Sequence, residues 1–584
     1  MRTIFKCTTL LVLLGMICAA CAPAAATQPP AAAAAQPTLA ASAPTEAPAE
    51  VEVTVEVQAP KAPAQPGEVV LSPDQVSSAV DIETAMRQAT SEGQVPGVVI
   101  LDGRGGPFRF NPSGDRTINL FYSDLTLRGI NNAFLPNAEG IYLDDTPADH
   151  LLIEGLAMRC SYTCLGMVGV HNDVTVRDNL FQAKAWGIGA NRGRNWIITG
   201  NLIQAGDHAV ALLHTRNARV TGNHLSGSHG VYLEGAVGSR ISENTFSSGW
   251  FGVLLTAEAA QNQVLDNSLL GVEQAGVALQ GGATDNTVGG NRVLCAQGRE
   301  CQELQIDSEL ASSNRTLAER ARTYQPADDR VVLTGEQVTS AGDIESAIQR
   351  ATARGTRPGE VILDGRAGPF TFTGSDRSIN IFHSNLTLRG INQAVIAGCD
   401  DGLYFGDTPA DHILVEGLSF HCTGDGVEVG QGHSDVTLRE NLFKVGLFGI
   451  GMGQGARDWT ITGNLIQAQK DAIWMASAVG VTIENNHLAG SSGVTLLQSS
   501  GNQVRGNTIR AQNQGVLLGQ ESAENSVEGN LILGVSAAGL ALEAGVTGNR
   551  VADNQVLCAL GTDCKTVDAQ PKVMLANSIA ANRP

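Results

Sequence analysis

The feature that most constrains this 584-residue chain is an asparagine that returns every 21 to 24 residues. Each one follows a short strand of alternating residues, such as DVTVRDN or NWIITGN. The asparagines are Asn179, Asn201, Asn223, Asn244, Asn267 and Asn291, then Asn441, Asn464, Asn486, Asn507, Asn530 and Asn554. A step of about 22 residues with two or three short strands predicts one coil of a solenoid. The asparagine fits a turn that needs a left-handed residue, and its amide is free to bond along the stack.

Several longer stretches of sequence also occur twice, much farther apart along the chain. VILDGRGGPFRF at 99–110 returns as VILDGRAGPFTF at 361–372, and ITGNLIQA at 198–205 returns at 461–468. The offset stays between 261 and 263 residues. The chain therefore contains two homologous halves, each with its own coil repeat.

Each half begins with a helical pattern. Ile82, Ala85, Met86 and Ala89 recur at helical spacing after Asp81, and the pattern returns at 343–351. Such a helix would cover the open edge of the first coil. With the coil repeat, this pattern resembles the right-handed parallel β-helix proteins of pectin-lyase-like fold, over roughly 69–301 and 331–564. The resemblance implies an all-β chain of two tandem right-handed parallel β-helices, each with an N-terminal capping α-helix, joined by a linker at 302–330 and followed by a tail at 565–584.

The N-terminus has the pattern of an export signal. Arg2 and Lys6 precede a short apolar run, and CAAC ends at Cys21. This resembles the cleavage box of bacterial lipoproteins, although Cys18 stands where that family usually carries leucine. The resemblance implies a signal peptide at 1–21 and lipidation of Cys21; the alternative is an ordinary signal cut in the alanines that follow. Residues 22–66 are rich in Ala and Pro and predict a disordered tether.

Charge and cysteine content narrow the class of protein. The formal charge of −20 excludes nucleic acid as an expected partner, because phosphate binding needs a basic surface. Eight cysteines remain after Cys21, an even number that predicts disulfides in an exported chain. We expect an extracytoplasmic protein, at the bacterial cell surface or in the periplasm, that touches the membrane through its lipid anchor alone. The sequence leaves its oligomeric state open.

The coil register predicts which cysteines pair. Cys295–Cys301 and Cys558–Cys564 have the same spacing at the ends of the two halves, and each should close a short loop. Cys160 should bond Cys164 within one turn. Cys399 and Cys422 are one coil apart and should lie about 4.8 Å from each other, close enough for a disulfide.

One set of candidate binding residues points outward from the predicted strands. In the repeated Gly-φ-x-φ strand, x faces solvent because the side-chain period is two. The outward positions include aromatic residues, which offer sugar rings an apolar face with a polar rim. The candidates for substrate binding are Tyr142, Tyr232, Tyr404, Glu428 and Trp474. The alternative is that these are isolated surface aromatics packed under loops.

A second column, just before the glycine of each strand, contains acids in the second half. Asp401 and Asp425 should be stacked one coil apart with Asp400 alongside, and Asp471 two coils further on. This arrangement partly resembles the polygalacturonase family, which implies an inverting hydrolase with catalytic Asp401, Asp425 and Asp471. The His and Arg-x-Lys motifs of that family are missing here. The other readings are a divalent cation such as Ca²⁺ at Asp400, Asp401 and Asp425, or ordinary Asp-Gly turn chemistry.

In the first half the same column carries His208 and His229, with Asp207 beside them. Two stacked imidazoles are candidate metal ligands. The sequence names no third ligand with certainty, and the second half has Asp471 and Ser492 at the matching positions. Three functions follow from these columns. We favour binding, with or without processing, of a polysaccharide or cell-envelope glycan; the alternatives are the hydrolase and a non-catalytic structural or adhesive protein.

Overall fold

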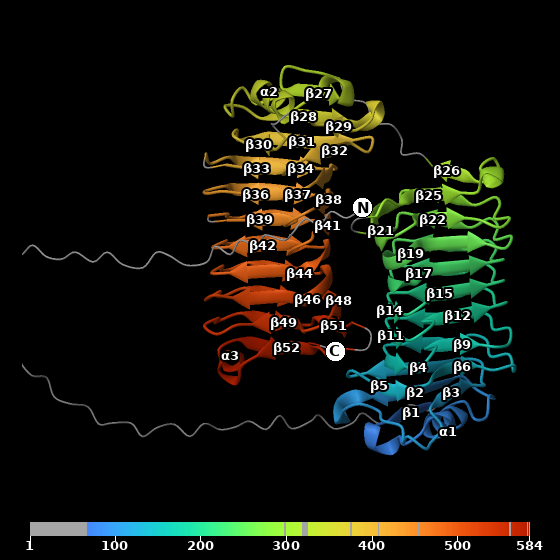
Figure 1. Cartoon of the computed structure of the whole chain (residues 1–584). Helices are drawn as coiled ribbons and strands as arrows, with labels where there is room; N and C mark the ends of the chain where they lie inside the picture. The colour runs from blue at the N-terminus through green and yellow to red at the C-terminus, as the bar shows by residue number, and fades with distance from the viewer. Residues whose placement is uncertain are drawn as a thin grey trace, which may run out of the picture. The chain divides into compact units, whose positions relative to one another are not determined.

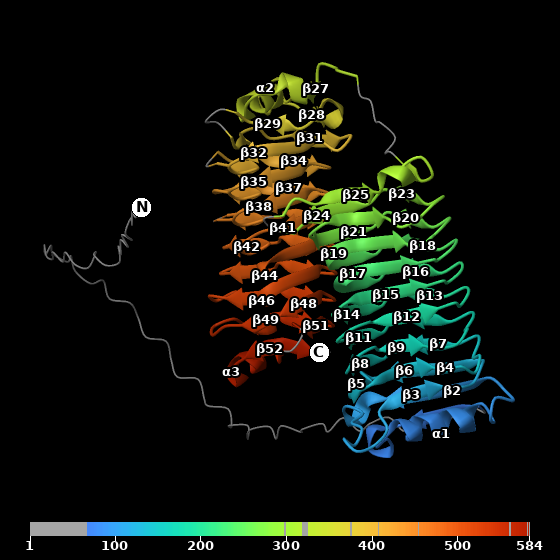
Figure 2. The same ribbon diagram turned by 45° about the vertical axis from the view of Figure 1, so that its right-hand side comes forward.

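The computed structural model describes residues 67–296, 299–317, 325–373, 377–406, 408–453, 455–559, 562–580 and 582. The expected signal peptide, the lipidation site Cys21 and the tether at 22–66 lie outside these residues. The described part of the chain is built from short strands stacked in register, one set in each half (Figures 1 and 2). All ladders between its strands are parallel, so the predicted right-handed parallel β-helix fold is confirmed.

Two sheets form the first half. The flat sheet contains, in stacking order, β1 (Glu68–Leu71), β2 (Gly97–Asp102), β4 (Leu125–Ile130), β7 (Leu152–Glu154), β10 (Thr175–Arg177), β13 (Ile197–Thr199), β16 (Arg219–Thr221), β18 (Arg240–Ser242), β20 (Gln263–Leu265), β23 (Thr287–Gly289) and β26 (Arg315–Leu317). The branched sheet contains β3 (Thr117–Leu120), β5 (Phe134–Ala138), β6 (Gly140–Leu143), β8 (Ala157–Cys160), β9 (Leu165–Met167), β11 (Leu180–Ala183), β12 (Ile188–Asn191), β14 (Leu202–Ala205), β15 (His208–Leu213), β17 (His224–Glu234), β19 (Thr245–Thr256), β21 (Ser268–Val272), β22 (Ala275–Leu279), β24 (Arg292–Cys295) and β25 (Gln302–Ile306).

The second half repeats this plan. Its flat sheet contains β27 (Arg330–Thr334), β28 (Gly359–Asp364), β31 (Leu386–Ile391), β34 (Asp411–Glu416), β37 (Ser434–Arg439), β40 (Thr460–Thr462), β43 (Thr482–Glu484), β45 (Gln503–Arg505), β47 (Ser526–Glu528), β50 (Arg550–Ala552) and β53 (Ser578–Ala580). Its branched sheet contains β29 (Phe370–Thr371), β30 (Ile379–Asn380), β32 (Val395–Cys399), β33 (Leu403–Phe405), β35 (Ser419–Cys422), β36 (Val427–Val429), β38 (Leu442–Val445), β39 (Ile450–Met452), β41 (Leu465–Gln467), β42 (Ile473–Ala476), β44 (His487–Leu497), β46 (Thr508–Gly519), β48 (Leu531–Val535), β49 (Ala538–Leu542), β51 (Gln555–Cys558) and β52 (Lys565–Ala569).

The branched sheets are named for what happens in their later coils. The short strands β14 and β15 belong to one coil, and both pair with the single long strand β17 of the next coil. The strands β41 and β42 join β44 in the same way. The column of residues just before each glycine lies at the bend between the two short strands. The outward column follows it within the second short strand.

The pairing moves two boundaries. Strand β25 pairs with β22 and β26 pairs with β23, so the first β-helix runs to Leu317 and takes in the first part of the expected linker at 302–330. At the other end, β52 pairs with β49 and β53 pairs with β50. The expected tail at 565–584 therefore contains the last coil of the second half. The asparagine ladder continues into these coils with a longer step of 28 residues: Asn286 N–H donates to Asn314 Oδ1 (2.9 Å), and Asn549 N–H donates to Asn577 Oδ1 (2.9 Å). A repeat of 21 to 24 residues therefore does not extend to them.

Helices α1 (Ala79–Ala89) and α2 (Ala341–Ala351) lie at the starts of the two halves, as expected. Each begins with a capping box, in which Ser78 N–H donates to Asp81 Oδ2 in α1 (2.9 Å) and Ser340 N–H donates to Asp343 Oδ2 in α2 (3.0 Å). The apolar faces of both helices are buried. A third helix, α3 (Pro571–Leu575), packs near β53. No helix in the described residues is long and apolar enough to cross a membrane.

The repeated asparagines are buried and bonded to one another along each stack. Asn464 N–H donates to Asn486 Oδ1 (2.9 Å), and Asn486 N–H donates to Asn507 Oδ1 in the next coil (2.9 Å). The side-chain amide of Asn464 also donates to Leu438 O (2.8 Å). The free amides expected from the sequence therefore form a continuous ladder that satisfies the buried turn backbone.

The small residue before each branched-sheet strand is required by packing. A Cβ on Gly230 would lie 2.1 Å from Phe246 Cδ1, and a Cβ on Gly187 would lie 2.1 Å from Ile203 Cγ2. The core side chains of the next coil fill that space. The glycine recurs because the backbone at this position lies too close to the core for a side chain.

All four predicted disulfides are confirmed. The bonds are Cys160–Cys164, Cys295–Cys301, Cys399–Cys422 and Cys558–Cys564. Cys399 and Cys422 are register partners in β32 and β35, with Cα atoms 4.6 Å apart. The pairing across one coil confirms the register taken from the sequence.

Candidate functional site

Residues of the outward column and residues of the column before the glycine lie together on the branched sheet of the first half. Trp186, His208 and His229 come from three successive coils. Trp186 precedes β12, His208 is the first residue of β15, and His229 lies within β17. His208 and His229 are register partners in β15 and β17. Their ring centroids lie 4.8 Å apart, and that of Trp186 lies 5.6 Å from His208. The coil-to-coil stacking therefore produces a row of rings.

Tyr232 joins this row from the outward column. Its ring stacks on His208 with a centroid distance of 4.7 Å and an interplanar angle of 11°. His229 in turn stacks on Phe251 (5.7 Å, 25°), and Trp250 approaches it edge-on (6.3 Å). Trp250 is 53% exposed. Trp186, His208, His229, Tyr232 and Trp250 are called the aromatic surface below.

Asp207 lies within this group and faces both imidazoles. Its Oδ1 is 3.4 Å from His208 Nδ1 and 3.8 Å from His229 Nδ1. Its other oxygen, Oδ2, accepts a hydrogen bond from Trp186 Nε1 (3.3 Å). His229 N–H donates to the Asp207 carbonyl (3.0 Å), so the backbone fixes the two coils in this register.

The two imidazoles are unusual in their environment. His208 Nδ1 and His229 Nδ1 are buried, and neither forms a well-made hydrogen bond, because the Asp207 oxygen that they face lies 3.4 Å and 3.8 Å away. Burial lowers the pKa of both histidines, against the opposing effect of the Asp207 carboxylate. Both rings are therefore favoured in the neutral form, with a nitrogen available as a ligand. Among the described residues, Asp207, His208 and His229 are the one group of three or more such side chains whose ligand atoms lie close together, all within 4.8 Å.

Tyr232 is held by a second contact on the outer side. Its hydroxyl donates to Glu234 Oε2 (2.9 Å). Burial and the Glu234 carboxylate raise the pKa of Tyr232 to about 12. The ring is thus fixed at both ends, by stacking on His208 and by this hydrogen bond.

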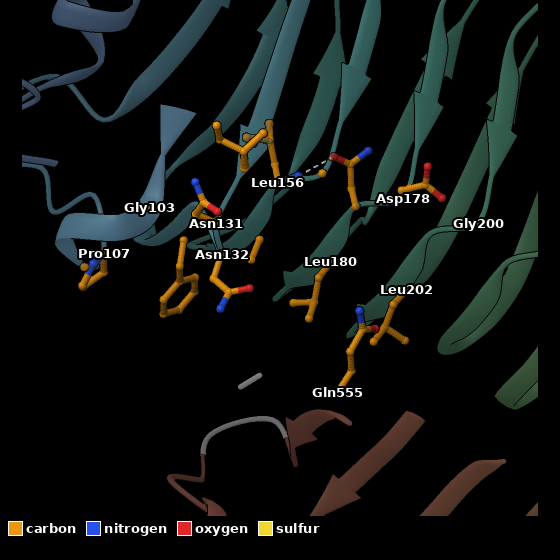
Figure 3. A pocket seen from close by; sticks show the side chains of 17 residues that line it. Gly103, Pro107, Asn131, Asn132, Leu156, Asp178, Leu180, Gly200, Leu202 and Gln555 are labelled. Carbon is orange, nitrogen blue, oxygen red and sulfur yellow. Dashed lines mark hydrogen bonds between the residues drawn. The ribbon is translucent and has the colours of Figure 1, made fainter. Parts of the chain in front are cut away.

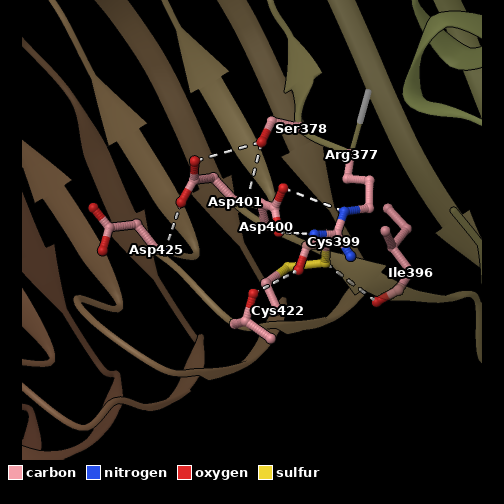
Figure 4. Close-up of a disulfide and its surroundings, with 9 residues drawn as sticks. Arg377, Ser378, Ile396, Cys399, Asp400, Asp401, Cys422 and Asp425 are labelled. Atoms are coloured by element: carbon pink, nitrogen blue, oxygen red, sulfur yellow. Dashed lines mark hydrogen bonds and ion pairs between the residues drawn. A yellow bond between two sulfur atoms is a disulfide. The ribbon is translucent and has the colours of Figure 1, made fainter. Parts of the chain in front are cut away.

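The acids of the second half have a different role. Asp425 N–H donates to Asp401 Oδ1 (2.8 Å) (Figure 4). In the next coil, Phe448 N–H donates to Asp425 Oδ1 (2.9 Å). Each carboxylate thus accepts a backbone hydrogen bond from the next coil. Asp400 does not join them as a cation ligand, because it forms an ion pair with Arg377 (2.6 Å). This geometry favours the turn chemistry considered as an alternative in the sequence.

Two carboxyl groups here, Asp425 of this column and Glu428 of the outward column, nevertheless have shifted pKa values. Burial, together with the neighbouring Asp401 carboxylate, raises the pKa of Asp425. Burial also raises the pKa of Glu428, with added repulsion from Asp401 and Asp425. The three acids are close enough to influence one another, as the stacked register predicts.

Further along the second half the predicted residues separate. Trp474 packs against Phe448 (5.7 Å between centroids), and Lys470 Nζ lies 4.8 Å above the Phe448 ring. Asp471 accepts a hydrogen bond from Thr495 Oγ1 (2.7 Å). Tyr404 is the register partner of Glu428, three coils from Trp474. The outward aromatics of this half therefore do not form one continuous surface.

Two pockets lie away from the aromatic surface. One of about 320 Å³ is lined by Tyr142, the exposed Tyr162 and Glu139, whose carboxylate is paired with Arg116. Tyr142 is thus four coils from Tyr232 and belongs to a different depression. A larger pocket is lined mainly by turn residues such as Gly103, Asn131 and Gly200 (Figure 3). The Asn131 amide there already donates to the Asp102 carboxylate (2.8 Å).

The structure thus brings together two groups of predicted site residues. Tyr232, His208 and His229 meet in the first half, and Asp401, Asp425 and Glu428 lie near one another in the second. From the sequence, Asp207 is only a neighbour of the histidines, and the predicted site does not include Trp186, Trp250 or Phe251. Trp186 stands in the same column as the histidines, so reading that column for rings as well as for acids would have found it. Phe251 stands directly before Gly252 and is the register partner of His229, so it belongs to that column too. Trp250 is one residue earlier, and no spacing rule marks it.

Comparisons with known proteins agree with this fold. Residues 401–556 match the family model described as right handed beta helix region, and residues 116–298 match the model described as periplasmic copper-binding protein (NosD). A search of curated proteins found no significant match.

Among solved structures, the chain is similar to three β-helix proteins at low identity. The A-module of mannuronan C-5 epimerase AlgE6 from Azotobacter vinelandii has 13% identity over 83% of this chain and 97% of that chain, with a TM-score of 0.21. A DFA-IIIase from Arthrobacter chlorophenolicus A6 has 10% identity over 66% and 95%, with a TM-score of 0.31. The PL6 family alginate lyase AlyGC has 10% identity over 88% and 100%, with a TM-score of 0.20. We draw no functional conclusion from these similarities.

Proposed function

We propose that the protein binds polysaccharide outside the cytoplasm, on the aromatic surface of the first β-helix. The observation that carries this proposal is the row of packed rings formed by Trp186, His208 and Tyr232, with Trp250 exposed at its end. Sugar rings stack on such faces because the aromatic ring offers a large apolar area with a polar edge.

Rigidity supports a binding role for this surface. Tyr232 is stacked on His208 and hydrogen-bonded to Glu234, so its orientation is set before any ligand arrives. A ring that is already ordered loses little conformational entropy on binding. Asp207 and Glu234 add carboxylates beside the rings, which can accept hydrogen bonds from sugar hydroxyls.

The disulfides support a location outside the cytoplasm. Four disulfides in one chain are typical of an oxidising compartment outside the cytoplasm. The family model that matches residues 116–298 is described as periplasmic, which agrees with this location. We extend the proposal to a lipid anchor at Cys21, with the tether at 22–66 between the membrane and the first β-helix.

The experiment is affinity electrophoresis of the full chain in gels that contain neutral and acidic polysaccharides. At least one polysaccharide should retard the chain. Trp186→Ala together with Trp250→Ala should weaken that retention at least about fivefold, since losing stacking costs about 0.5–1.5 kcal/mol per ring. The matched control is Phe382→Ala, which removes an exposed ring of the second half.

Two results would reject the proposal: no retardation by any polysaccharide, or equal retardation of the double variant and the wild type. New reducing ends in the same incubations would instead point to the hydrolase alternative. Retention by a polysaccharide without new reducing ends would support glycan binding over hydrolysis. The third alternative, a structural or adhesive protein, does not require such retention.

A further inference from the structure

Asp207, His208 and His229 have a further role that glycan stacking does not need. We propose that these three side chains hold a divalent late-transition-metal ion of the Cu²⁺ or Zn²⁺ class, through Asp207 Oδ1, His208 Nδ1 and His229 Nδ1. This inference goes beyond the proposed function and does not depend on it.

The separations of the ligand atoms fit such an ion. The carboxylate oxygen lies 3.4 Å and 3.8 Å from the two Nδ1 atoms, and all three ligand atoms lie within 4.8 Å. Ligands at about 2.0–2.1 Å from a tetrahedral metal are roughly 3.3 Å apart. Small rotations of the two imidazoles would close the remaining difference.

The strongest support is the unsatisfied pair of nitrogens. A buried polar atom without a partner costs about 1–3 kcal/mol and is rare in a native protein. Here two such atoms, His208 Nδ1 and His229 Nδ1, face the same carboxylate oxygen. At 3.4 Å and 3.8 Å the Asp207 oxygen is too far for a well-formed hydrogen bond to either nitrogen, whereas a metal ion among the three atoms would bind both nitrogens and the carboxylate.

The surroundings also hold the ligands in place. Trp186 Nε1–H occupies the second oxygen of Asp207, so Oδ1 is left to face the histidines. Tyr232 stacks on His208 and Phe251 stacks on His229, which orients both rings. Outer contacts of this kind commonly fix metal ligands and tune affinity.

The donor set selects the metal class. Two imidazoles and one carboxylate suit Zn²⁺, Cu²⁺ and related ions, whereas Ca²⁺ prefers six to eight oxygens. With three protein ligands, such a site keeps at least one coordination position for water or another ligand. The Ca²⁺ considered at Asp400, Asp401 and Asp425 has no comparable set of free donors, because Asp400 is paired with Arg377.

The duplication provides an internal comparison. The residues at the matching positions of the second half are Lys470, Asp471 and Ser492. Lys470 brings a positive charge where the first half has the Asp207 carboxylate, and neither histidine is repeated. We therefore expect one site per chain.

The test is titration of the full chain with Cu²⁺ and, separately, with Zn²⁺ at pH 7, followed by isothermal calorimetry. One equivalent should bind tightly, and Ca²⁺ should not compete for it. Asp207→Asn, His208→Gln and His229→Gln should each abolish this equivalent. Trp186→Phe keeps a ring but loses the hydrogen bond to Asp207, and should weaken binding about 10- to 100-fold.

The matched control is His150→Gln. His150 is exposed and also lies near two carboxylates, those of Asp124 (3.3 Å) and Asp173 (3.8 Å), so it represents an ordinary surface histidine. The control should bind like the wild type. Electron paramagnetic resonance of the wild-type chain with one equivalent of Cu²⁺ should show coupling to two nitrogens, a readout that needs no variant to fold.

Three results would overturn the proposal. The first is failure of the wild-type chain to bind either ion tightly, and the second is unchanged binding in the three ligand variants. The third is a Cu²⁺ signal without coupling to two nitrogens.

Discussion

Replacing a single buried asparagine should open the β-helix locally, and Asn464→Leu is the clearest case. The substitution keeps the approximate size of the side chain and removes its hydrogen bonds. Asn464 Oδ1 accepts from Asn441 N–H (2.9 Å), and Asn464 Nδ2 donates to Leu438 O (2.8 Å). Both partners are buried, so water cannot replace the lost bonds.

The size of the effect follows from these two contacts. Each buried polar group that loses its partner costs about 1–3 kcal/mol. With two such groups, Asn464→Leu should remove about 2–6 kcal/mol of local stability. Even the lower figure corresponds to a roughly 30-fold change in the opening equilibrium.

Amide hydrogen exchange is the suitable assay, because coils of a solenoid open locally and a single unfolding midpoint would average over both halves. Peptides that cover β38 and β41 should exchange at least about 30-fold faster in the variant. The control is Asn513→Leu, at an exposed asparagine of β46, which should change stability by no more than about 0.5 kcal/mol. Equal exchange in the two variants would show that the ladder adds no stability.

Three further predictions concern other parts of the fold. Replacing Cys399 and Cys422 with serine should destabilise the first coils of the second half by about 2–4 kcal/mol, measured by hydrogen exchange of that region; no change would mean that the bond is dispensable. Arg104 holds the pKa of Asp102 at about 2, below the unfolded value of about 3.9, so the stability from this ionised carboxylate is present above pH 4 and lost as the pH falls through 2. The urea midpoint should accordingly drop between pH 5 and pH 2.5, and less so in Asp102→Asn; an equal drop would contradict this origin. Asp425→Asn should not lower the thermal midpoint, because the amide oxygen can still accept the backbone hydrogen bond and the substitution removes a charge that burial and Asp401 disfavour, whereas Asp425→Ala should cost about 1–3 kcal/mol; equal midpoints for the two variants would remove the turn role.

The parts of the structure that the sequence predicts are those set by the coil repeat. Asn464 and its counterparts recur because every coil has the same buried turn, so their spacing alone gives the register. Cys399 and Cys422 could be paired because that register places them in adjacent coils. The last coils do not fit the repeat because their asparagines, Asn314 and Asn577, follow their ladder partners by 28 residues instead of 21 to 24.

The site was harder to predict because it depends on which columns lie side by side. His208 and Tyr232 are 24 residues apart and belong to different columns, yet their rings stack once β15 and β17 pair. The free Nδ1 atoms of the histidines could not be read from the sequence at all, since a partner for them can come from any neighbouring coil. For Asp401 and Asp425 the sequence predicts the stacking. In the structure their carboxylate oxygens accept hydrogen bonds from backbone N–H groups.

The most direct test of a glycan-binding aromatic surface is hydroxyl-radical footprinting of the full chain, with and without a polysaccharide that retards it. Trp250 is 53% exposed, and Trp186 and Tyr232 are partly exposed, so all three rings can be labelled. The account predicts that bound polysaccharide protects Trp186, Tyr232 and Trp250 while labelling of Phe382 stays the same. Protection confined to other residues, or unchanged labelling of all three rings at a saturating polysaccharide concentration, would contradict it.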